Sequence, residues 1–307
     1  MRDAVTDPGN AAPGTAAFAR HGQVRLRAGL RDAPVREISR LAALPHVLPM
    51  LARLPPRAPH LRVTATRAGG EVLAVAGTGE VCDEKATARD WPVHKTPTGG
   101  WSQDRRQRST EQAWDVNARE LASVITAAAQ DIHAEHILIA GDVRARGLLL
   151  EHLDPQLRQE AVVIEDEVPP DSEAAAEAVA RIIAVRAERA CRDRFGHWQE
   201  QLGRGGATEG LADTMTALSD GRAADVFLTA QFTDSQEGGA AVAWIGPGGT
   251  ELAGAAARLA ERGVSEPASD RADAAITRAI ACSDAELFFL PADMPAPRDG
   301  IAATLRY

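Results

Sequence analysis

Between residues 111 and 133, apolar side chains recur at intervals of three and four positions along the chain. The series is Trp114, Ala118, Leu121, Ile125, Ala128 and Ile132. This spacing places the apolar side chains on one stripe of an amphipathic helix. The stretch before it, residues 91–110, contains two prolines and two adjacent glycines, which interrupt both helices and strands. The pattern therefore predicts an irregular loop that leads directly into a long helix.

Apolar and polar residues alternate elsewhere with the period of a strand. Residues 16–30 alternate around a His-Gly pair, and residues 61–77 alternate around an Ala-Gly-Gly turn, so each stretch predicts a β-hairpin. Short apolar runs at 136–142 and 161–168 predict buried strands, with a helix between them at 143–153. The predicted order after residue 60 is ββ-α-β-α-β, which is typical of an α/β layer.

A second α/β pattern follows a long helix. Asp171 or Ser172 can cap a helix that starts near residue 173 and ends at the glycine-rich stretch 203–206. We expect this helix to link two α/β units. The second unit has three predicted helices, at 208–224, 251–263 and 270–284. Its predicted strands are at 225–232, 240–246, 285–292 and 300–307. A helix interrupted by prolines is predicted at 41–54.

Charge and cysteine content limit the function. The chain has 34 Lys and Arg against 43 Asp and Glu, a net charge of -9, so a general nucleic-acid coat is excluded and any RNA contact must be local. The 3 cysteines are far apart, which argues against a disulfide scaffold and a zinc site and fits a cytoplasmic protein. We expect no metal, no cofactor, no signal peptide and no membrane span.

The loop and the start of the helix carry the candidate site. In the sequence Gly99-Gly100-Trp101-Ser102-Gln103, the glycines allow the backbone to approach a ligand, and the amide of Gln103 can hold a nucleophilic water. From composition alone, a glycine-rich surface loop explains the same residues. The candidate RNA-binding residues are His94, Lys95, Trp101, Arg105, Arg106 and Arg108. Cations at a helix N-terminus oppose the helix dipole, which favours a phosphate-binding role for the arginines.

These residues resemble a known family. The run WPVHKTPTGGWSQDRRQRSTEQAWDVNARELA resembles the central domain of actinobacterial release-factor-like proteins. Two later runs, HILIAGDVRARGLLLEHL and LGRGGATEGLADTMTALSDGRAADVFL, and the ending GIAATLRY, resemble the same family. The family is a bacterial branch of the archaeal and eukaryotic class-I release factor and Pelota superfamily, related to the Balon hibernation factor and to Vms-type peptidyl-tRNA hydrolases.

The resemblance implies a fold and a domain organisation. A disordered tail (1–15) and a reduced N-terminal segment (16–55) precede a central release-factor-like α/β domain (56–203). A C-terminal α/β/α sandwich similar to the L7Ae fold (204–307) follows, joined by the long helix. Two departures from the family pattern matter. Trp101 and Ser102 separate Gly100 from Gln103, where release factors have Gly-Gly-Gln, and the segment that reads stop codons is short and lacks an NIKS sequence.

The resemblance implies a ribosome-associated protein that binds the A site without reading a stop codon, in translation stress, hibernation or rescue. Its partners would be rRNA near the peptidyl-transferase centre and tRNA, and a translational GTPase is a partner that the resemblance allows. We expect neither a membrane nor DNA as a partner. The alternative is a peptidyl-tRNA ester hydrolase in which Gly99, Gly100 and Gln103 release nascent chains. Whether the protein is an enzyme stays open, and a small-molecule binding protein is a third hypothesis.

Overall fold

The computed structural model describes residues 13–33, 37–88, 103–164, 169–234 and 241–307; for residues 83–88, 103–110 and 234 it describes the backbone alone. The chain divides into two compact units. Residues 56–185 form one, here called the central unit. Residues 1–55 and 186–307 together form the other, here called the composite unit.

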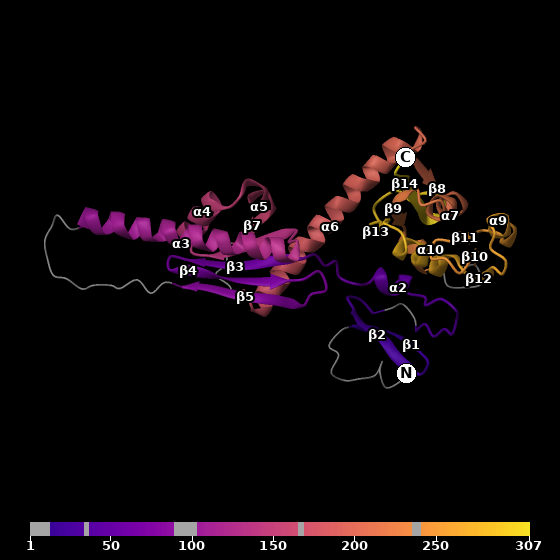
Figure 1. The fold of residues 1–307 in the computed structure, drawn as a ribbon, viewed down its shortest axis with the longest axis horizontal. Coiled ribbons are helices and arrows are strands. Elements are labelled where there is room, and N and C mark those ends of the chain that lie inside the picture. Colours follow the sequence, from indigo (N-terminus) through magenta and orange to yellow (C-terminus); the bar gives the residue numbers. More distant parts are fainter. Residues whose placement is uncertain (1–12, 34–36, 89–102, 165–168, 235–240) are drawn as a thin grey trace. The chain divides into compact units, whose positions relative to one another are not determined.

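A five-stranded sheet of order β5-β4-β3-β6-β7 forms the centre of the central unit (Figure 1). Its strands are β3 (His60–Thr66), β4 (Gly69–Val75), β5 (Val81–Ala88), β6 (His136–Gly141) and β7 (Ala161–Val163). Strands β3, β4 and β5 are antiparallel neighbours, whereas β6 runs parallel to β3 and β7 parallel to β6. The predicted hairpin β3–β4 is present, but its turn is Arg67 and Ala68, because Gly69 and Gly70 of the predicted turn pair with β3.

Helices cover both faces of this sheet. They are α3 (Gln103–Ile132), α4 (Val143–His152), α5 (Pro155–Glu160) and α6 (Glu173–Leu202). The helix α3 packs Leu121 and Ile125 against Leu61 and Val63 of β3, in a core that also takes in Leu149 of α4. On the opposite face, Val179 and Ile183 of α6 contact Leu138 of β6. Alternate residues of β6 therefore serve two cores, Ile137 and Ile139 one and Leu138 the other.

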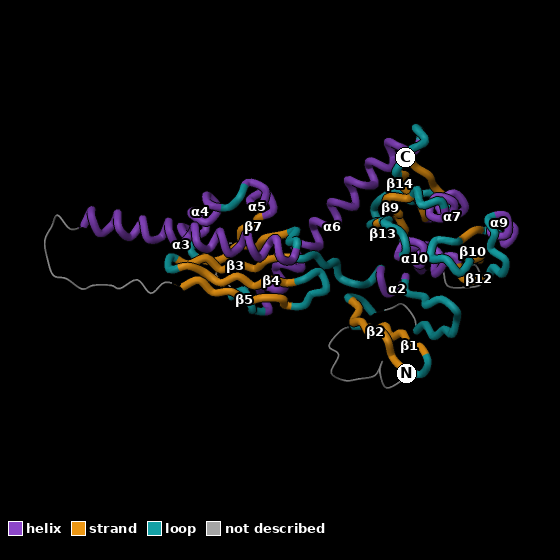
Figure 2. The backbone as a smooth tube through the Cα atoms, viewed as in Figure 1, coloured by secondary structure: helices purple, strands orange, loops and turns teal. Residues whose placement is uncertain are grey.

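The C-terminal part of the composite unit is a second α/β layer, with a four-stranded sheet of order β13-β9-β14-β8 and a smaller antiparallel sheet of order β11-β10-β12 (Figure 2). The strands of the larger sheet are β8 (Ala207–Glu209), β9 (Ala223–Leu228), β13 (Glu286–Phe289) and β14 (Ile301–Leu305). Those of the smaller sheet are β10 (Val242–Ile245), β11 (Leu252–Ala253) and β12 (Ala268–Arg271). Helical segments α7 (Leu211–Ser219), α8 (Ala230–Asp234), α9 (Ala256–Glu261), α10 (Ala272–Ala281) and η1 (Arg298–Gly300) complete it.

Each central strand of the larger sheet contributes to two hydrophobic cores. Val226 and Leu228 of β9 pack with α7 and α10, while Phe227 between them packs with Phe195 and Trp198 of α6. The rings of Phe195 and Trp198 stack with centroids 4.7 Å apart. Helices therefore lie on both faces of this sheet, so the α/β class predicted from the sequence is confirmed for both units.

The N-terminal residues of the composite unit form a hairpin and one short helix. Strand β1 (Gly14–Arg20) pairs antiparallel with β2 (Gln23–Leu30), as predicted. The helix α2 (Leu48–Leu51) is a single turn with Pro49 in its first turn. Leu48 has no exposed surface and lies in the same core as Val226 and Ile276. A segment from the N-terminal end of the chain thus completes the core built by the C-terminal end.

Several predicted elements differ from the structure. Strand β5 was not predicted, because residues 81–88 are polar and lack alternation, as is usual for an edge strand. The first residues of the predicted helices at 208–224 and 270–284 belong to strands, β8 and β12. The predicted strand at 225–232 ends at Leu228, before α8. Within the described residues, no helix is both long enough and apolar enough to cross a membrane.

Candidate functional site

The most distinctive feature of the central unit is a helix that is longer than the sheet beneath it. Helix α3 has 30 residues, and its N-terminal turns extend past the end of the sheet in Figure 1. Trp114 lies beside Arg67 of the β3–β4 turn, which marks the end of the sheet. Residues 103–113 therefore form an arm about 16 Å long beyond this point.

Gln103 is the first residue of this arm, and Arg105, Arg106 and Arg108 lie in the first two turns of α3. For these four residues the structure describes the backbone and not the side chains. The other predicted site residues, His94, Lys95, Gly99, Gly100 and Trp101, lie outside the described residues. The structure thus places the predicted glutamine and arginines together at one helix end, and leaves the loop that precedes them as a prediction.

A group of contacts, here called the helix-base clamp, fixes α3 where it leaves the sheet. The clamp consists of Arg67, Trp114, Asn117 and Asp142. The guanidinium carbon of Arg67 lies 5.0 Å from the centroid of the Trp114 ring, in a cation–π contact. The same guanidinium pairs with the carboxylate of Asp142 at 2.8 Å, and the Asn117 amide donates to the Arg67 carbonyl at 3.0 Å. These contacts tie α3, the β3–β4 turn and the end of β6 together.

Asp142 is the residue of the clamp with the most partners. Its carboxylate caps α4 by accepting from the backbone amides of Arg144 and Ala145, and its own amide donates to the Ala65 carbonyl at 2.9 Å. The hydrogen bond from Ala145 first, and then the contact with Arg67, lower the pKa of the Asp142 carboxyl below its ordinary value. The carboxylate is therefore charged at neutral pH, which the ion pair with Arg67 requires.

A second contact holds α3 to α4 through Asp115, the residue after Trp114. The carboxylate of Asp115 lies 2.6 Å from Nε2 of His152 and 2.9 Å from the Arg119 guanidinium. The hydrogen bond with His152 is the main cause of a lowered pKa for the Asp115 carboxyl. The sequence pointed to Trp114 as part of the apolar stripe, and Asp142 followed a predicted strand, but nothing in their spacing indicated that Arg67 joins them.

Two glycines allow the backbone elements under α3 to approach closely. A Cβ atom on Gly70 would lie 2.7 Å from a Leu121 side-chain atom, so α3 sits directly on β4 at this point. Gly141 has a φ of +105°, and a Cβ there would overlap the Ala65 carbonyl oxygen. The arm therefore rises from a densely packed base, and dense packing limits rotation of the helix.

The end of the arm has the chemistry of an anion-binding site. The first four backbone amides of a helix have no partner within the helix, and the helix dipole adds a partial positive charge there. In α3 these amides belong to residues 103–106, which include Arg105 and Arg106. Such an end can bind a phosphate or stabilise an oxyanion.

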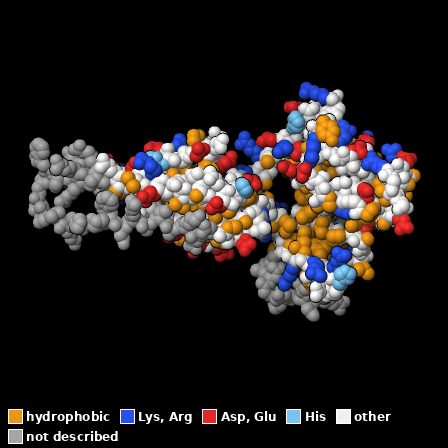
Figure 3. Space-filling view, in the orientation of Figure 1, with side chains coloured by type: hydrophobic (Ala, Val, Ile, Leu, Met, Phe, Trp, Pro, Cys, Tyr) orange, Lys and Arg blue, Asp and Glu red, His pale blue; other side chains and the backbone are white. Residues whose placement is uncertain are grey.

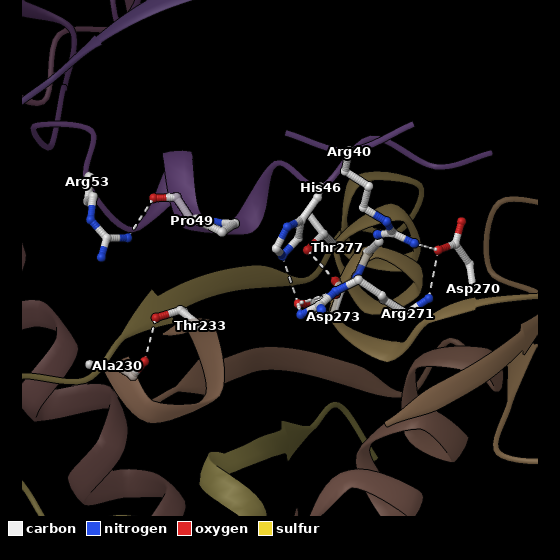
Figure 4. A network of polar contacts seen from close by, with 11 residues as sticks. Arg40, His46, Pro49, Arg53, Ala230, Thr233, Asp270, Arg271, Asp273 and Thr277 are labelled. Carbon is white, nitrogen blue, oxygen red and sulfur yellow. Dashed lines mark hydrogen bonds and ion pairs between the residues drawn. The ribbon is translucent and has the colours of Figure 1, made fainter. Parts of the chain in front are cut away.

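A second cluster of charged residues lies in the composite unit (Figure 4). Nε2 of His46 lies 2.9 Å from the Asp273 carboxylate, which also accepts from Nε of Arg271 at 3.0 Å. Arg40 pairs with Asp270, whose carboxylate also accepts from the Leu44 amide at 3.1 Å. The side chains of His46, Asp270 and Asp273 are all buried. Every charge in the cluster has a partner, so it attaches residues 40–46 to β12 and α10.

Burial acts to raise the pKa of the Asp273 carboxyl, but the hydrogen bonds from His46 and Arg271 outweigh burial and hold the pKa far below its ordinary value. The described residues hold no group of three or more His, Cys, Asp or Glu side chains that could bind a metal ion. The helix end and its base are therefore the candidate functional site.

Part of the chain matches a known family. Residues 59–204, which include α3 and the clamp, match the sequence model of bacterial archaeo-eukaryotic release factor family 2. The chain is also 28% identical to the uncharacterized protein Rv2629 of Mycobacterium tuberculosis, over 100% of this chain and 82% of the relative.

Solved structures of Pelota are similar as well. Pelota of Archaeoglobus fulgidus aligns with a TM-score of 0.39 and 12% identity over 82% of this chain and 66% of that one. The archaeal Pelota in a model of ribosome-bound Pelota and ABCE1 gives a TM-score of 0.47 and 11% identity over 82% of this chain and 62% of that one. The chain thus spans less than two thirds of either Pelota chain. The match over residues 59–204 confirms the resemblance seen in the sequence: this part of the chain is similar to a bacterial release-factor-like family, the bacterial archaeo-eukaryotic release factors.

Proposed function

We propose that the protein binds the ribosomal A site without reading a stop codon, and that it acts in hibernation, protection or rescue of ribosomes under stress. The observation that carries this proposal is the arm of α3, residues 103–113, which extends past the sheet from a clamped base. In this proposal the end of the arm and the preceding residues 94–102 contact rRNA near the peptidyl-transferase centre and the tRNA held there.

The arm suits this role because it is a continuous helix. A helix keeps its direction over its whole length, so the clamp at Trp114 and Asn117 fixes where Gln103 lies relative to the sheet. At the far end, three arginines and the unpaired amides of the first turn supply positive charge. Guanidinium groups bind phosphate oxygens in pairs of hydrogen bonds, so this end fits an RNA backbone.

The way residues 14–54 are built into the composite unit suits a role without stop-codon reading. Residues 14–30 form a two-stranded hairpin, and residues 40–54 pack on β12, α10 and the core of the composite unit. The sequence also lacks the NIKS motif. A protein with this N-terminal segment can occupy the site of a release factor while leaving the codon unread.

The test is ribosome pelleting across a salt series. A triple variant, Arg105→Ala with Arg106→Ala and Arg108→Ala, should bind 70S ribosomes more weakly. The slope of log affinity against log salt should also fall by about 2, since each lost phosphate contact removes roughly 0.7 to 0.9 from the slope. The matched control removes three exposed arginines elsewhere, Arg181, Arg204 and Arg258. Equal binding by the wild type and the arm variant would contradict the proposal.

A second candidate function is hydrolysis of the ester between peptide and tRNA. Gln103 favours it, because this residue begins α3 and lies among the unpaired amides of the first turn. The amide of Gln103 would orient a water that attacks the ester carbonyl, and the helix amides would stabilise the oxyanion. The C–O bond to the tRNA ribose then breaks, which gives a free peptide carboxylate and the tRNA hydroxyl.

Peptide release from purified stalled ribosomes, with pelleting of the same samples, separates the two functions. A hydrolase requires that wild type releases peptide and that Gln103→Ala still pellets but releases at least 100-fold more slowly. Pelleting without release by the wild type would support occupancy alone. Pelleting repeated with a translational GTPase and GTP tests delivery: an increase in bound protein would support such a partner.

A further inference from the structure

The β1–β2 hairpin is the most strongly basic element among the described residues. Residues 14–30 contain three arginines and a histidine and no Asp or Glu, in a chain whose net charge is -9. His21 and Gly22 form the turn, with φ values of 53° and 77°, so the two strands are joined by a tight two-residue loop. Figure 3 shows Arg and His side chains gathered in this region of the composite unit.

Two of these arginines have no polar partner among the described residues. Arg20 and Arg25 are exposed, and neither makes an ion pair or side-chain hydrogen bond with any described residue. Arg25 lies at a β-bulge, since the pairing passes from Phe18–Leu26 to Ala19–Val24 and skips it. A bulge changes the direction in which a strand presents its side chains, and such bulges often lie at functional positions.

The hairpin is anchored at its base and open at its tip. Leu30, the last residue of β2, is 5% exposed, and the Arg31 amide donates to the Arg53 carbonyl at 3.0 Å. The tip carries the exposed residues Arg20, His21 and Arg25. A hairpin with exposed faces contributes little to a core. A hairpin that is fixed at its base and charged at its tip is therefore suited to contact a partner.

The chemistry of the tip favours a nucleic-acid backbone. Arginine binds phosphate oxygens bidentately, and two-stranded ribbons enter the grooves of nucleic acids. A membrane surface fits less well: proteins that lie on membranes insert large apolar or aromatic side chains, whereas the tip from Arg20 to Arg25 has only Val24, which is 42% exposed.

We propose that the tip of the β1–β2 hairpin, through Arg20, His21 and Arg25, binds the phosphate backbone of RNA. This contact is separate from the α3 arm, which belongs to the other unit of the chain. It rests on the proposed function in one respect, namely that the RNA is ribosomal. The hairpin then gives the protein a second, sequence-independent hold on its partner.

The double variant Arg20→Ala with Arg25→Ala tests this site. Both residues are exposed and unpaired among the described residues, so the variant should keep the thermal stability of the wild type. We expect a loss of affinity for 70S ribosomes and for a 20-base-pair RNA duplex of about 10-fold at low salt, with a salt slope reduced by about 1.5. Replacing both arginines by lysine should restore part of the affinity, because lysine keeps the charge and loses the bidentate geometry.

The control variant removes two exposed arginines of the same unit, Arg204 and Arg258, and should bind like the wild type. Unchanged affinity of the hairpin variant for the RNA duplex would overturn the inference, and so would an equal loss in the control. If the wild-type protein binds vesicles of phosphatidylserine and phosphatidylcholine but does not bind RNA, and the hairpin variant loses the vesicle binding, the tip contacts a lipid surface instead. If the wild type fails to pellet with ribosomes, the proposed function fails, and the RNA duplex still decides the role of the hairpin.

Discussion

Gly141 lies where β6 meets β3, directly before the carboxylate that holds the clamp. Its φ is +105°, and an added Cβ would overlap the Ala65 carbonyl oxygen and lie 2.9 Å from the Ala65 nitrogen. The neighbouring atoms belong to backbone, which moves only if the paired strands separate. We therefore expect Gly141→Ala to lower the free energy of unfolding by at least about 2 kcal/mol, measured by urea denaturation.

Gly147 provides the matched control for this substitution. It lies in α4, a few residues beyond Gly141, and an added Cβ would meet no atom within 4 Å. An alanine there replaces a poor helix former with a good one, so Gly147→Ala should stabilise the protein by about 0.5 to 1 kcal/mol. If both variants were destabilised alike, the close approach of β6 to β3 would not be the cause.

Asp273 gives a pH dependence at the residue scale. Its carboxyl has a lowered pKa in the folded protein, despite the opposing effect of burial. The stabilisation is therefore complete above the pKa of an unfolded carboxyl, about 3.9, and is lost as pH falls from there toward the folded pKa. The stability difference between the wild type and Asp273→Asn should be largest near neutral pH and shrink below pH of about 4, in urea titrations. Asp284→Asn, at an exposed carboxylate, should show a small difference throughout.

At the scale of single residues, the sequence identified local roles better than partners. Asp142 follows an apolar run and precedes a helix, which is enough to expect a cap. Its pairing with Arg67 depends on the parallel register of β3 and β6, in which His60 lies opposite His136, 76 positions later in the chain. The same holds for His46 and Asp273, which are 227 residues apart in the chain. Such pairs follow from the fold and have no local pattern.

At the scale of elements, the arm of α3 can be separated from its base. Gln112 is exposed and lies two residues before Trp114, on the projecting side of the clamp. Gln112→Pro should interrupt the helix there, because proline lacks an amide hydrogen and clashes with the preceding turn. The sheet and its core begin beyond this point, so the thermal stability of the central unit should fall by only a few degrees.

Ribosome affinity should respond differently from stability. If the arm places Gln103 and the arginines against RNA, Gln112→Pro should weaken ribosome pelleting at least 10-fold, while Gln112→Ala should leave it unchanged. A proline variant that pellets like the wild type would show that the direction of the arm does not matter. The contact would then reside in the base or in the other unit.

The pattern of apolar residues predicted α3, α6 and the β3–β4 hairpin because each has many residues that follow one period. It failed for β5 and β8, whose positions depend on a neighbouring strand and not on their own composition. In α3 the predicted helix began at Glu111, yet the observed helix begins at Gln103. The added turns are rich in charge and have no apolar stripe, because nothing of the sheet lies beneath them.

At the scale of the whole molecule, the composite unit joins the two ends of the chain. The core around Val226, Ile276 and Ile301 also contains Leu48, which has no exposed surface. No sequence pattern indicated this, since residues 41–54 read as a helix interrupted by prolines, with no sign of which core it would join. The polar cluster of Arg40, His46, Asp270 and Asp273 fastens the same segment at the surface of the unit. The N-terminal segment is therefore part of the fold of the C-terminal residues.

This organisation predicts which part of the molecule responds to a substitution at Leu48. Leu48→Ala removes buried methyl groups from a closed core, and such changes cost about 2 to 5 kcal/mol. Amide hydrogen exchange should accelerate in β9 and β14, which line that core, while β3 and β6 keep their protection because their core lies in the central unit. Leu41→Ala, at a fully exposed position of the same segment, should change neither. If exchange in β3 and β6 accelerates as much as in β9 and β14, the two units unfold as one. The hairpin and the arm would then belong to a single cooperative structure.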